Sequence, residues 1–270
     1  TLKIKDIRIS NDLPIVLIAG PCQIESLNHS LKIAENLCNL GQKLNFKLIF
    51  KGSFDKANRT SINSKRGVGI EEGLTILDKI KSEFNCPVLT DVHEPEQCSK
   101  TSEVTDVIQI PAFLCRQTDL LIAAGKTGKP LNIKKGQFLA PNDMKFIAQK
   151  ISSVGNDNIM LCERGTSFGY NNLINDFRSI PIMAETGYPI VFDATHSVQL
   201  PGNNNGSSGG QRKFVPALAS AACAVGVAAI FIETHEDPDN APSDGANMIP
   251  LSEMELVMSK IKVIDDLIKN

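Results

Sequence analysis

Four residues of types that bind metal ions follow short β-branched runs in this chain. Cys22, His196 and Glu233 lie at the ends of VLIAGPC, IVFDATH and AIFIETH, and Asp244 lies in the loop after the last of these runs. Strands of one parallel barrel would bring all four together, although they span most of the chain. A thiolate, an imidazole and two carboxylates can hold a divalent first-row metal ion. The pattern therefore indicates a candidate metal site.

Eight short apolar runs predict the strands that would position these residues, and helical patterns lie between most of them. The runs are 14–20, 47–54, 87–92, 106–112, 130–136, 158–165, 189–196 and 228–235. Strands that alternate with helices predict a parallel sheet, and eight units predict a closed (β/α)8 TIM barrel of class α/β. An open doubly wound sheet is the competing fold, but no Gly-x-Gly-x-x-Gly follows the first strand.

The barrel is expected to occupy the whole chain as one domain, residues 1–270. Within it, residues 1–12 are expected to form an N-terminal β extension that closes the barrel bottom. The segment 202–210 (GNNNGSSGG) follows the seventh strand. A mobile lid over the active site and a disordered surface loop are both consistent with its composition.

Composition excludes several classes of protein. The 270 residues are 42% hydrophobic, enough for a substantial core, and the formal net charge of −2 gives no reason to expect nucleic acid. No apolar stretch approaches the roughly 20 residues that span a bilayer, and the first ten residues lack the apolar core of a signal peptide. Seven cysteines without a C-x-x-C pair indicate reduced thiols. We therefore expect a cytoplasmic protein with no membrane partner.

Polar and charged residues follow almost every predicted strand. The carboxyl ends of the strands form the catalytic face of a barrel, and here that face would hold four or five cations. Any one of these cations is easily explained as a solvated rim residue, Cys22 alone as a packed thiol and His196 alone as a satisfied strand-end histidine. Because all these residues would lie at one end of one barrel, a shared functional site explains them better than separate structural roles. A substrate with phosphate and carboxylate groups would balance the cations.

Long motifs in the chain resemble those of the 3-deoxy-D-manno-octulosonate 8-phosphate synthase family. They are GPCQIES (20–26), FKGSFDKANRTS (50–61), TDVHEP (90–95), IQIPAFLCRQTDLL (108–121), NIKKGQF (132–138), CERGTSFGYNNL (162–173), FDATHSVQLPG (192–202) and IETHEDPDNAPSDG (232–245). The resemblance runs from end to end. It implies a (β/α)8 barrel, a homotetramer, and condensation of phosphoenolpyruvate with D-arabinose 5-phosphate on the route to the lipopolysaccharide sugar KDO.

The resemblance also separates subclasses. The related heptulosonate 7-phosphate synthases, which use erythrose 4-phosphate, carry a Lys-Pro-Arg-Thr-Ser type motif where this chain has Lys56-Ala57-Asn58-Arg59-Thr60-Ser61. Metal-independent members have Asn at the position of Cys22 and commonly Cys-Asp-Gly at the position of 243–245, which here is Ser-Asp-Gly. The chain therefore resembles the metal-dependent arabinose 5-phosphate enzymes.

Roles carried over from the family are assigned by motif. The implied metal ligands are Cys22, His196, Glu233 and Asp244, for Zn(II), Fe(II), Mn(II) or Co(II). The implied phosphoenolpyruvate contacts are Ser53, Lys56, Lys134, Gln137 and Arg164. The implied arabinose 5-phosphate contacts are Asn58, Arg59 and, from a neighbouring subunit, Arg116. The implied catalytic residues are Lys51, Asp91, His196 and Asp244.

Alternatives to this assignment remain open at this point. Lys51, Lys56 and Lys134 are candidates for a Schiff-base nucleophile, although arginines and metal ligands nearby favour anion binding. A heptulosonate synthase would differ in its acceptor sugar. A catalytically inactive barrel that senses a sugar phosphate would be expected to have lost metal or lysine positions, and here none is lost.

Overall fold

A closed ring of eight parallel strands forms the centre of the described molecule, which comprises residues 1–59, 61–204 and 207–269 of this computed structural model. The strands run in the order β3–β4–β5–β6–β7–β8–β11–β14, and β14 pairs with β3 to close the ring. Their bounds are β3 Val16–Gly20, β4 Lys47–Lys51, β5 Val88–Asp91, β6 Val107–Ile110, β7 Leu131–Lys134, β8 Ile159–Glu163, β11 Ile190–Asp193 and β14 Ala229–His235. All eight predicted strands and the TIM barrel are confirmed.

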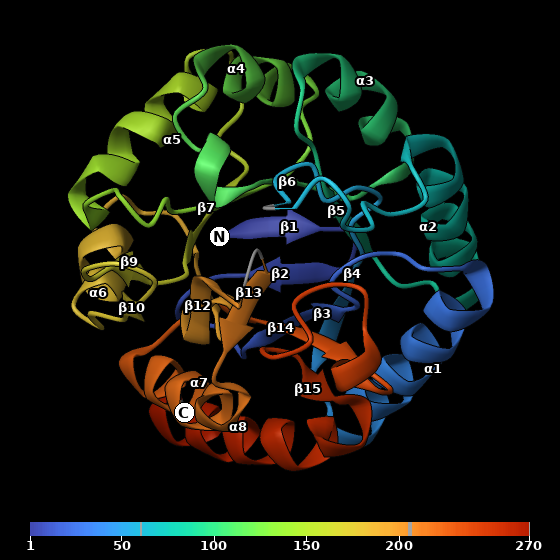
Figure 1. The fold of residues 1–270 in the computed structure, drawn as a ribbon. Coiled ribbons are helices and arrows are strands. Elements are labelled where there is room, and N and C mark those ends of the chain that lie inside the picture. Colours follow the sequence, from blue (N-terminus) through green and yellow to red (C-terminus); the bar gives the residue numbers. More distant parts are fainter. Residues whose placement is uncertain (60, 205–206, 270) are drawn as a thin grey trace.

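Helices surround this ring on its outer side (Figure 1). Their bounds are α1 Leu27–Leu44, α2 Ile70–Phe84, α3 Pro95–Val104, α4 Thr118–Lys126, α5 Met144–Ser152, α6 Ser179–Ala184, α7 Val215–Val225 and α8 Met254–Lys269. Because successive strand residues face opposite sides, Leu17 packs outward among helix residues while Val16 and Ile18 fill the barrel interior. Both faces are therefore apolar, as a buried parallel sheet requires.

The N-terminal extension is a β-hairpin of β1 (Leu2–Ile4) and β2 (Ile7–Ile9) that lies across the middle of the ring in Figure 1. Alternate residues of its strands, Leu2, Ile4, Ile7 and Ile9, are buried and join the apolar cluster of the barrel interior. The expected closing extension is thus confirmed, and the carboxyl end of the barrel is left for function.

Shorter elements occupy the loops. They are β9 Thr166–Ser167, β10 Leu173–Ile174, β12 Gln199–Asn204, β13 Ser207–Gly210, β15 Ile249–Pro250, and the 3-10 turns η1 Ala112–Leu114, η2 Pro141–Asp143, η3 His196–Val198, η4 Arg212–Phe214, η5 Pro238–Asn240 and η6 Leu251–Glu253. In the segment expected to be an irregular loop, β12 and β13 pair antiparallel around residues 205–206, which lie outside the described residues. Because β12 and β13 pair, the residues on either side of 205–206 do not form the disordered surface loop that their composition allowed. The mobile lid over the active site stays a prediction.

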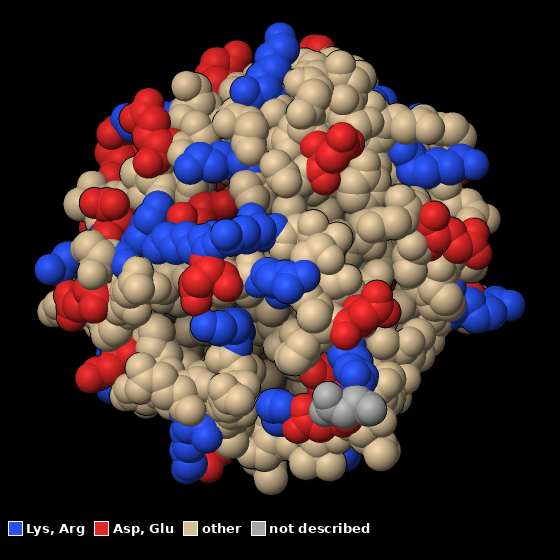
Figure 2. All heavy atoms as spheres, turned by 180° about the vertical axis from the view of Figure 1, so that it is seen from behind, with Lys and Arg blue, Asp and Glu red and all other residues tan. Residues whose placement is uncertain are grey.

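The face turned away from the viewer of Figure 1 carries both signs of charge. Lys and Arg side chains lie among Asp and Glu side chains there (Figure 2), in keeping with a net charge of −2. Within the described ranges, no helix combines the length and the apolar character needed to cross a membrane.

Candidate functional site

The four predicted metal ligands meet at the carboxyl end of the barrel. Cys22 follows β3, His196 lies just after β11, Glu233 is on β14, and Asp244 is in the following loop. The Cys22, Glu233 and Asp244 ligand atoms lie within 4.8 Å of one another. His196 Nε2 lies 3.6 Å from Glu233 Oε2 and 3.5 Å from Asp244 Oδ2. The barrel thus brings together residues from three separate strand ends.

The chemistry of this cluster fits a divalent metal ion. Glu233 Oε2 is buried without a hydrogen-bond partner, an arrangement that needs an explanation such as a bound ion. Burial raises the pKa of the Cys22 thiol well above its usual value, and the Glu233 charge raises it further. The thiol therefore keeps its proton until a cation displaces it, as metal-binding thiols do. One sulfur, one imidazole and two carboxylates could together hold such an ion.

Lys51 forms hydrogen bonds to two of these predicted ligands. Its Nζ donates to Glu233 Oε1 at 2.6 Å and to the carbonyls of Cys22 and Pro21 at 2.6 and 3.1 Å. Burial alone would raise the pKa of Glu233, but the charges of Lys51, His196 and Lys56 outweigh burial and lower that pKa to about 2. All three donors of Lys51 are engaged, which suits a positioning cation better than a Schiff-base nucleophile.

Asp193 orients His196, a role that the sequence did not reveal. Its Oδ2 lies 2.7 Å from His196 Nδ1, which leaves Nε2 free to face the other ligands. A carboxylate behind a ligating histidine fixes the ring orientation and the nitrogen that binds the metal. The signal was present in FDATH, where an aspartate ends the strand three residues before the histidine.

Lys134 shares this carboxylate. Lys134 Nζ lies 2.5 Å from Asp193 Oδ2 and 3.8 Å from the centre of the Phe231 ring, so the lysine is held between an anion and an aromatic face. Burial would raise the pKa of Asp193, but His196 and Lys134 outweigh burial and hold that pKa well below its usual range. Asp193 is therefore ionised, and its carboxylate links the predicted metal ligand His196 to Lys134, the lysine predicted to bind phosphate.

The residues predicted to hold phosphoenolpyruvate contain buried polar atoms without partners. Arg164 is buried, and its Nη2 donates to Gln199 Oε1 at 2.9 Å, while its Nε and Nη1 have no partner within the described residues. Ser53 Oγ and Gln137 Oε1 are also buried without partners. Burial lowers the pKa of Arg164, and the charge of Asp193 opposes this shift. The Arg164 nitrogens and the Ser53 hydroxyl are donors that a bound anion would satisfy, whereas Gln137 could reach an anion only through its amide nitrogen.

Asp91 lies beside the same group of cations. His93 Nε2 is 3.2 Å from Asp91 Oδ2, while Asp91 Oδ1 is buried without a partner. Burial would raise the pKa of Asp91, but Lys56 and His93 outweigh burial and lower it well below its usual range. Asp91 is therefore a buried anion with one oxygen open for a further contact.

The predicted arabinose 5-phosphate residues are less enclosed. Asn58 is exposed and Arg59 is half-buried on the loop after β4, where Arg59 Nη2 donates to Gln23 Oε1 at 2.8 Å. Arg116 is exposed between η1 and α4, and no contact between its side chain and the metal ligands is observed within 1–59, 61–204 and 207–269. Arg116 therefore lies apart from the predicted metal ligands in a single chain.

Known proteins similar to this chain agree with the motif resemblance. The model of the DAHP synthetase I family matches residues 1–270. The 2-dehydro-3-deoxyphosphooctonate aldolase of Rickettsia bellii is 58% identical over 268 residues, which are 99% of this chain and 98% of the relative. The protein of the same name from Granulibacter bethesdensis is 60% identical over 260 residues, 96% of this chain and 92% of the relative.

A third relative of that name, from Rickettsia typhi, is 59% identical over 268 residues, again 99% of this chain and 98% of the relative. The name is a synonym of 3-deoxy-D-manno-octulosonate 8-phosphate synthase, so the predicted family resemblance is confirmed. The chain belongs to the DAHP synthetase I family and, within it, to the 2-dehydro-3-deoxyphosphooctonate aldolases.

Proposed function

We propose that this protein condenses phosphoenolpyruvate with D-arabinose 5-phosphate and water, forming 3-deoxy-D-manno-octulosonate 8-phosphate and inorganic phosphate for KDO and lipopolysaccharide synthesis. The observation that carries the proposal is the buried Arg164, whose Nε and Nη1 have no hydrogen-bond partner among the described residues. Because a buried cation without a partner is costly, these two nitrogens favour an anionic ligand at this site. The names of the similar proteins support the same reaction.

Binding two phosphorylated substrates together is the main task of the residues. We assign the phosphoenolpyruvate phosphate to Lys134 and Arg164, and its carboxylate to Ser53, Lys56 and Gln137. The arabinose 5-phosphate phosphate goes to Arg59, with Asn58 beside the sugar. Alignment of two reactants can remove about 7–11 kcal/mol of barrier in favourable cases. The cations at both phosphates would provide that alignment.

The reaction then follows from the chemistry of the substrates. Carbon C3 of phosphoenolpyruvate attacks the aldehyde carbon of the sugar, water adds at C2, and the resulting hemiketal phosphate loses inorganic phosphate. Lys51, Asp91, His196 and Asp244 are the residues proposed for catalysis, and Lys51 would act by holding Glu233 in position. A divalent ion held by Cys22, His196, Glu233 and Asp244 would supply Lewis acidity to an oxygen of the substrate or water.

We further propose that the enzyme is a cytoplasmic homotetramer that needs Zn(II), Fe(II), Mn(II) or Co(II). The exposed Arg116 supports assembly, because a neighbouring copy would be needed to bring it to a sugar phosphate. All seven cysteines are free thiols, which suits a reducing compartment.

Phosphate release from phosphoenolpyruvate tests the proposal directly. The assay compares arabinose 5-phosphate with erythrose 4-phosphate, before and after treatment with a strong chelator. We expect release that needs arabinose 5-phosphate, stops on chelation and returns with added metal. A preference for erythrose 4-phosphate would make the protein a heptulosonate synthase. If neither sugar led to phosphate release, the protein would be a non-catalytic barrel. Activity that is unchanged by the chelator would refute the metal requirement.

A further inference from the structure

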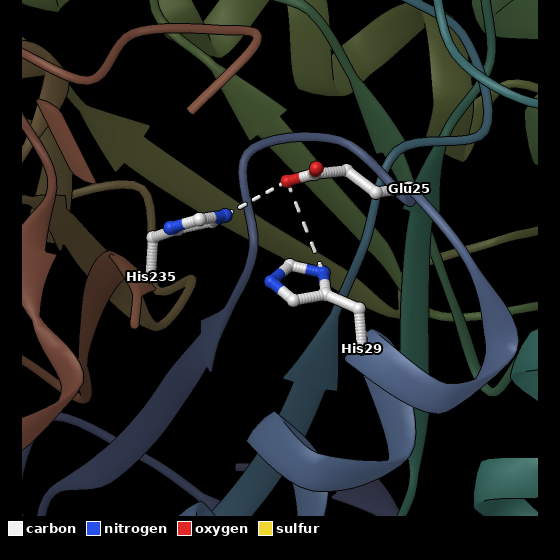
Figure 3. Close-up of side chains that lie close together, drawn as sticks. All are labelled: Glu25, His29 and His235. Atoms are coloured by element: carbon white, nitrogen blue, oxygen red, sulfur yellow. Dashed lines mark hydrogen bonds and ion pairs between the residues drawn. The ribbon is translucent and has the colours of Figure 1, made fainter. Parts of the chain in front are cut away.

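A second cluster of side chains connects the two loops that carry Cys22 and Asp244. It consists of Glu25, His29 and His235, which Figure 3 shows pointing toward one another. His235 Nε2 lies 2.8 Å from Glu25 Oε1, and His29 Nδ1 lies 3.9 Å from the same oxygen. The two imidazole rings pack with their centres 4.7 Å apart. The donor types resemble those of a zinc site. Whether His235 could bind a metal ion depends on which of its two ring nitrogens carries the proton.

The backbone fixes the tautomer of His235. The Asp237 amide donates to His235 Nδ1 at 2.9 Å, and because an amide N–H can only donate, Nδ1 must accept. The neutral ring therefore carries its proton on Nε2, where it donates to Glu25. A metal ion would need the Nε2 lone pair that this proton occupies. The cluster is accordingly a directed hydrogen-bond chain from Asp237 through His235 to Glu25, and not a second metal site.

This chain joins the two ligand-bearing loops at their bases. Glu25 lies three residues after Cys22 and directly before Ser26, which caps α1 by accepting from the His29 amide. Asp237 lies in the loop after β14 that leads to Asp244. The hydrogen bond between His235 and Glu25 therefore links these two loops, in addition to the contacts of Cys22 Sγ with Ser243 Oγ at 2.9 Å and Asp244 Oδ2 at 3.4 Å.

Asp244 adopts a backbone conformation that is uncommon for a non-glycine residue. Its φ is 49°, in the left-handed region that non-glycine residues rarely adopt. Gly245 beside it is confined as well, since a Cβ there would lie 2.0 Å from the Pro238 carbonyl oxygen. A residue held in such a conformation persists only when its surroundings determine it.

We propose that Glu25 and His235 are positioning residues, whose hydrogen bond holds the Cys22 loop and the Asp244 loop together for metal binding. The proposal rests on the proposed metal site. It predicts that loss of the Glu25–His235 bond between the loops weakens metal affinity. Loss of the bond within the second loop, from the Asp237 amide to His235, should weaken it less.

Four variants separate the two bonds. In His235→Gln, the amide nitrogen stands near Nε2 and keeps a donor to Glu25. His235→Asn is too short to reach Glu25 but keeps an acceptor near Nδ1. Glu25→Gln keeps an acceptor for His235, and Glu25→Ala removes it. Lys32→Met is the matched control, because the exposed Lys32–Glu236 ion pair of 2.6 Å joins the same two segments away from this chain of bonds.

Three measurements on the full protein follow. A chromophoric chelator in competition gives the number of Zn(II) ions bound and their affinity. The thiolate-to-Co(II) charge-transfer band of Co(II)-loaded protein reports the bond to Cys22. Thermal melting of the metal-free protein reports fold stability.

We expect Glu25→Ala and His235→Asn to weaken metal affinity by about 10- to 100-fold and to alter the Co(II) band, as loss of outer partners of a metal site does. Glu25→Gln, His235→Gln and Lys32→Met should keep the wild-type affinity and band. Equal affinity in all variants, with only melting changed, would overturn the proposal. So would a second bound ion in the wild type that Glu25→Ala removes. A wild type that binds no ion would instead overturn the proposed metal site itself.

Discussion

The predicted metal-ligand side of the site and the predicted sugar-phosphate side are built in different ways. Cys22, His196 and Glu233 are buried, and they sit at strand ends or in the first residues beyond them. Asn58 is exposed and Arg59 half-buried on a long loop after β4. The barrel itself therefore positions the predicted metal ligands, whereas the predicted sugar-phosphate residues lie on a loop.

Burial makes the two sides differ in energetics as well. On the metal side, Lys51 pairs with Glu233 at 2.6 Å and Lys134 with Asp193 at 2.5 Å, all four side chains being nearly inaccessible. Removing one partner of a buried pair leaves an uncompensated charge, which costs about 3–5 kcal/mol. Solvent replaces lost contacts on the exposed side, so substitutions there should have smaller effects.

The largest effect is expected at Cys22. Cys22→Ala should abolish bound metal and activity together, because the thiolate is the sole sulfur ligand of the set. Metal analysis and phosphate release after chelator treatment measure both, and circular dichroism should show an intact barrel. Cys38→Ala, which alters a half-buried thiol on α1, is the control and should keep its metal. Full activity of chelator-treated Cys22→Ala protein would refute the assignment.

A slightly smaller effect is expected at Arg164. Arg164→Ala should lower kcat/KM for phosphoenolpyruvate by a factor that corresponds to about 2–5 kcal/mol, typical of a buried charge that loses its partner. Arg164→Lys keeps the positive charge but cannot form two parallel hydrogen bonds to a phosphate as a guanidinium can. It should therefore recover part of the lost kcat/KM. Steady-state kinetics at saturating arabinose 5-phosphate measure this. An unchanged KM for phosphoenolpyruvate in both variants would place the substrate phosphate elsewhere.

Asp193→Asn should lower metal affinity indirectly, through its contacts with Lys134 and His196. The amide cannot pair with Lys134 as an anion, and if its NH2 group donates to His196 Nδ1, the ring proton must lie on Nε2, where it blocks metal binding. We expect metal affinity to fall by about 10- to 100-fold, as for other partners of ligating histidines. Chelator competition measures the loss. Affinity equal to wild type would show that His196 is oriented by its backbone alone.

How much the sequence could predict follows the same division. The eight strands and the convergence of Cys22, His196, Glu233 and Asp244 were predicted, because the ends of parallel strands must meet at one face of a barrel. Asp193 was overlooked although it precedes His196 by three residues, since the sequence does not show which strand-end carboxylate turns toward which side chain.

Loops were predicted less well, for a physical reason. The composition of 202–210 indicated irregular backbone, yet β12 and β13 pair across residues 199–204 and 207–210. Glycine, asparagine and serine have low strand propensity, but cross-strand hydrogen bonds depend on which segments lie opposite each other. The position of Arg116 likewise depends on a neighbouring copy, which a single sequence pattern does not place.

The smallest effect is expected at Arg59, on the exposed side of the comparison. Its guanidinium already bonds Gln23 Oε1 at 2.8 Å and the Lys65 carbonyl at 3.0 Å, so the loop holds the side chain before any substrate arrives. Hydrogen bonds to charged groups contribute about 1.5–3 kcal/mol, and partial exposure places Arg59→Ala near the lower limit, about tenfold in KM for arabinose 5-phosphate. KM for phosphoenolpyruvate and the metal content should not change, which separates this loop from the buried centre. A rise in both KM values together would mean that the loop after β4 belongs energetically to the metal side, and that the division between the two sides is wrong.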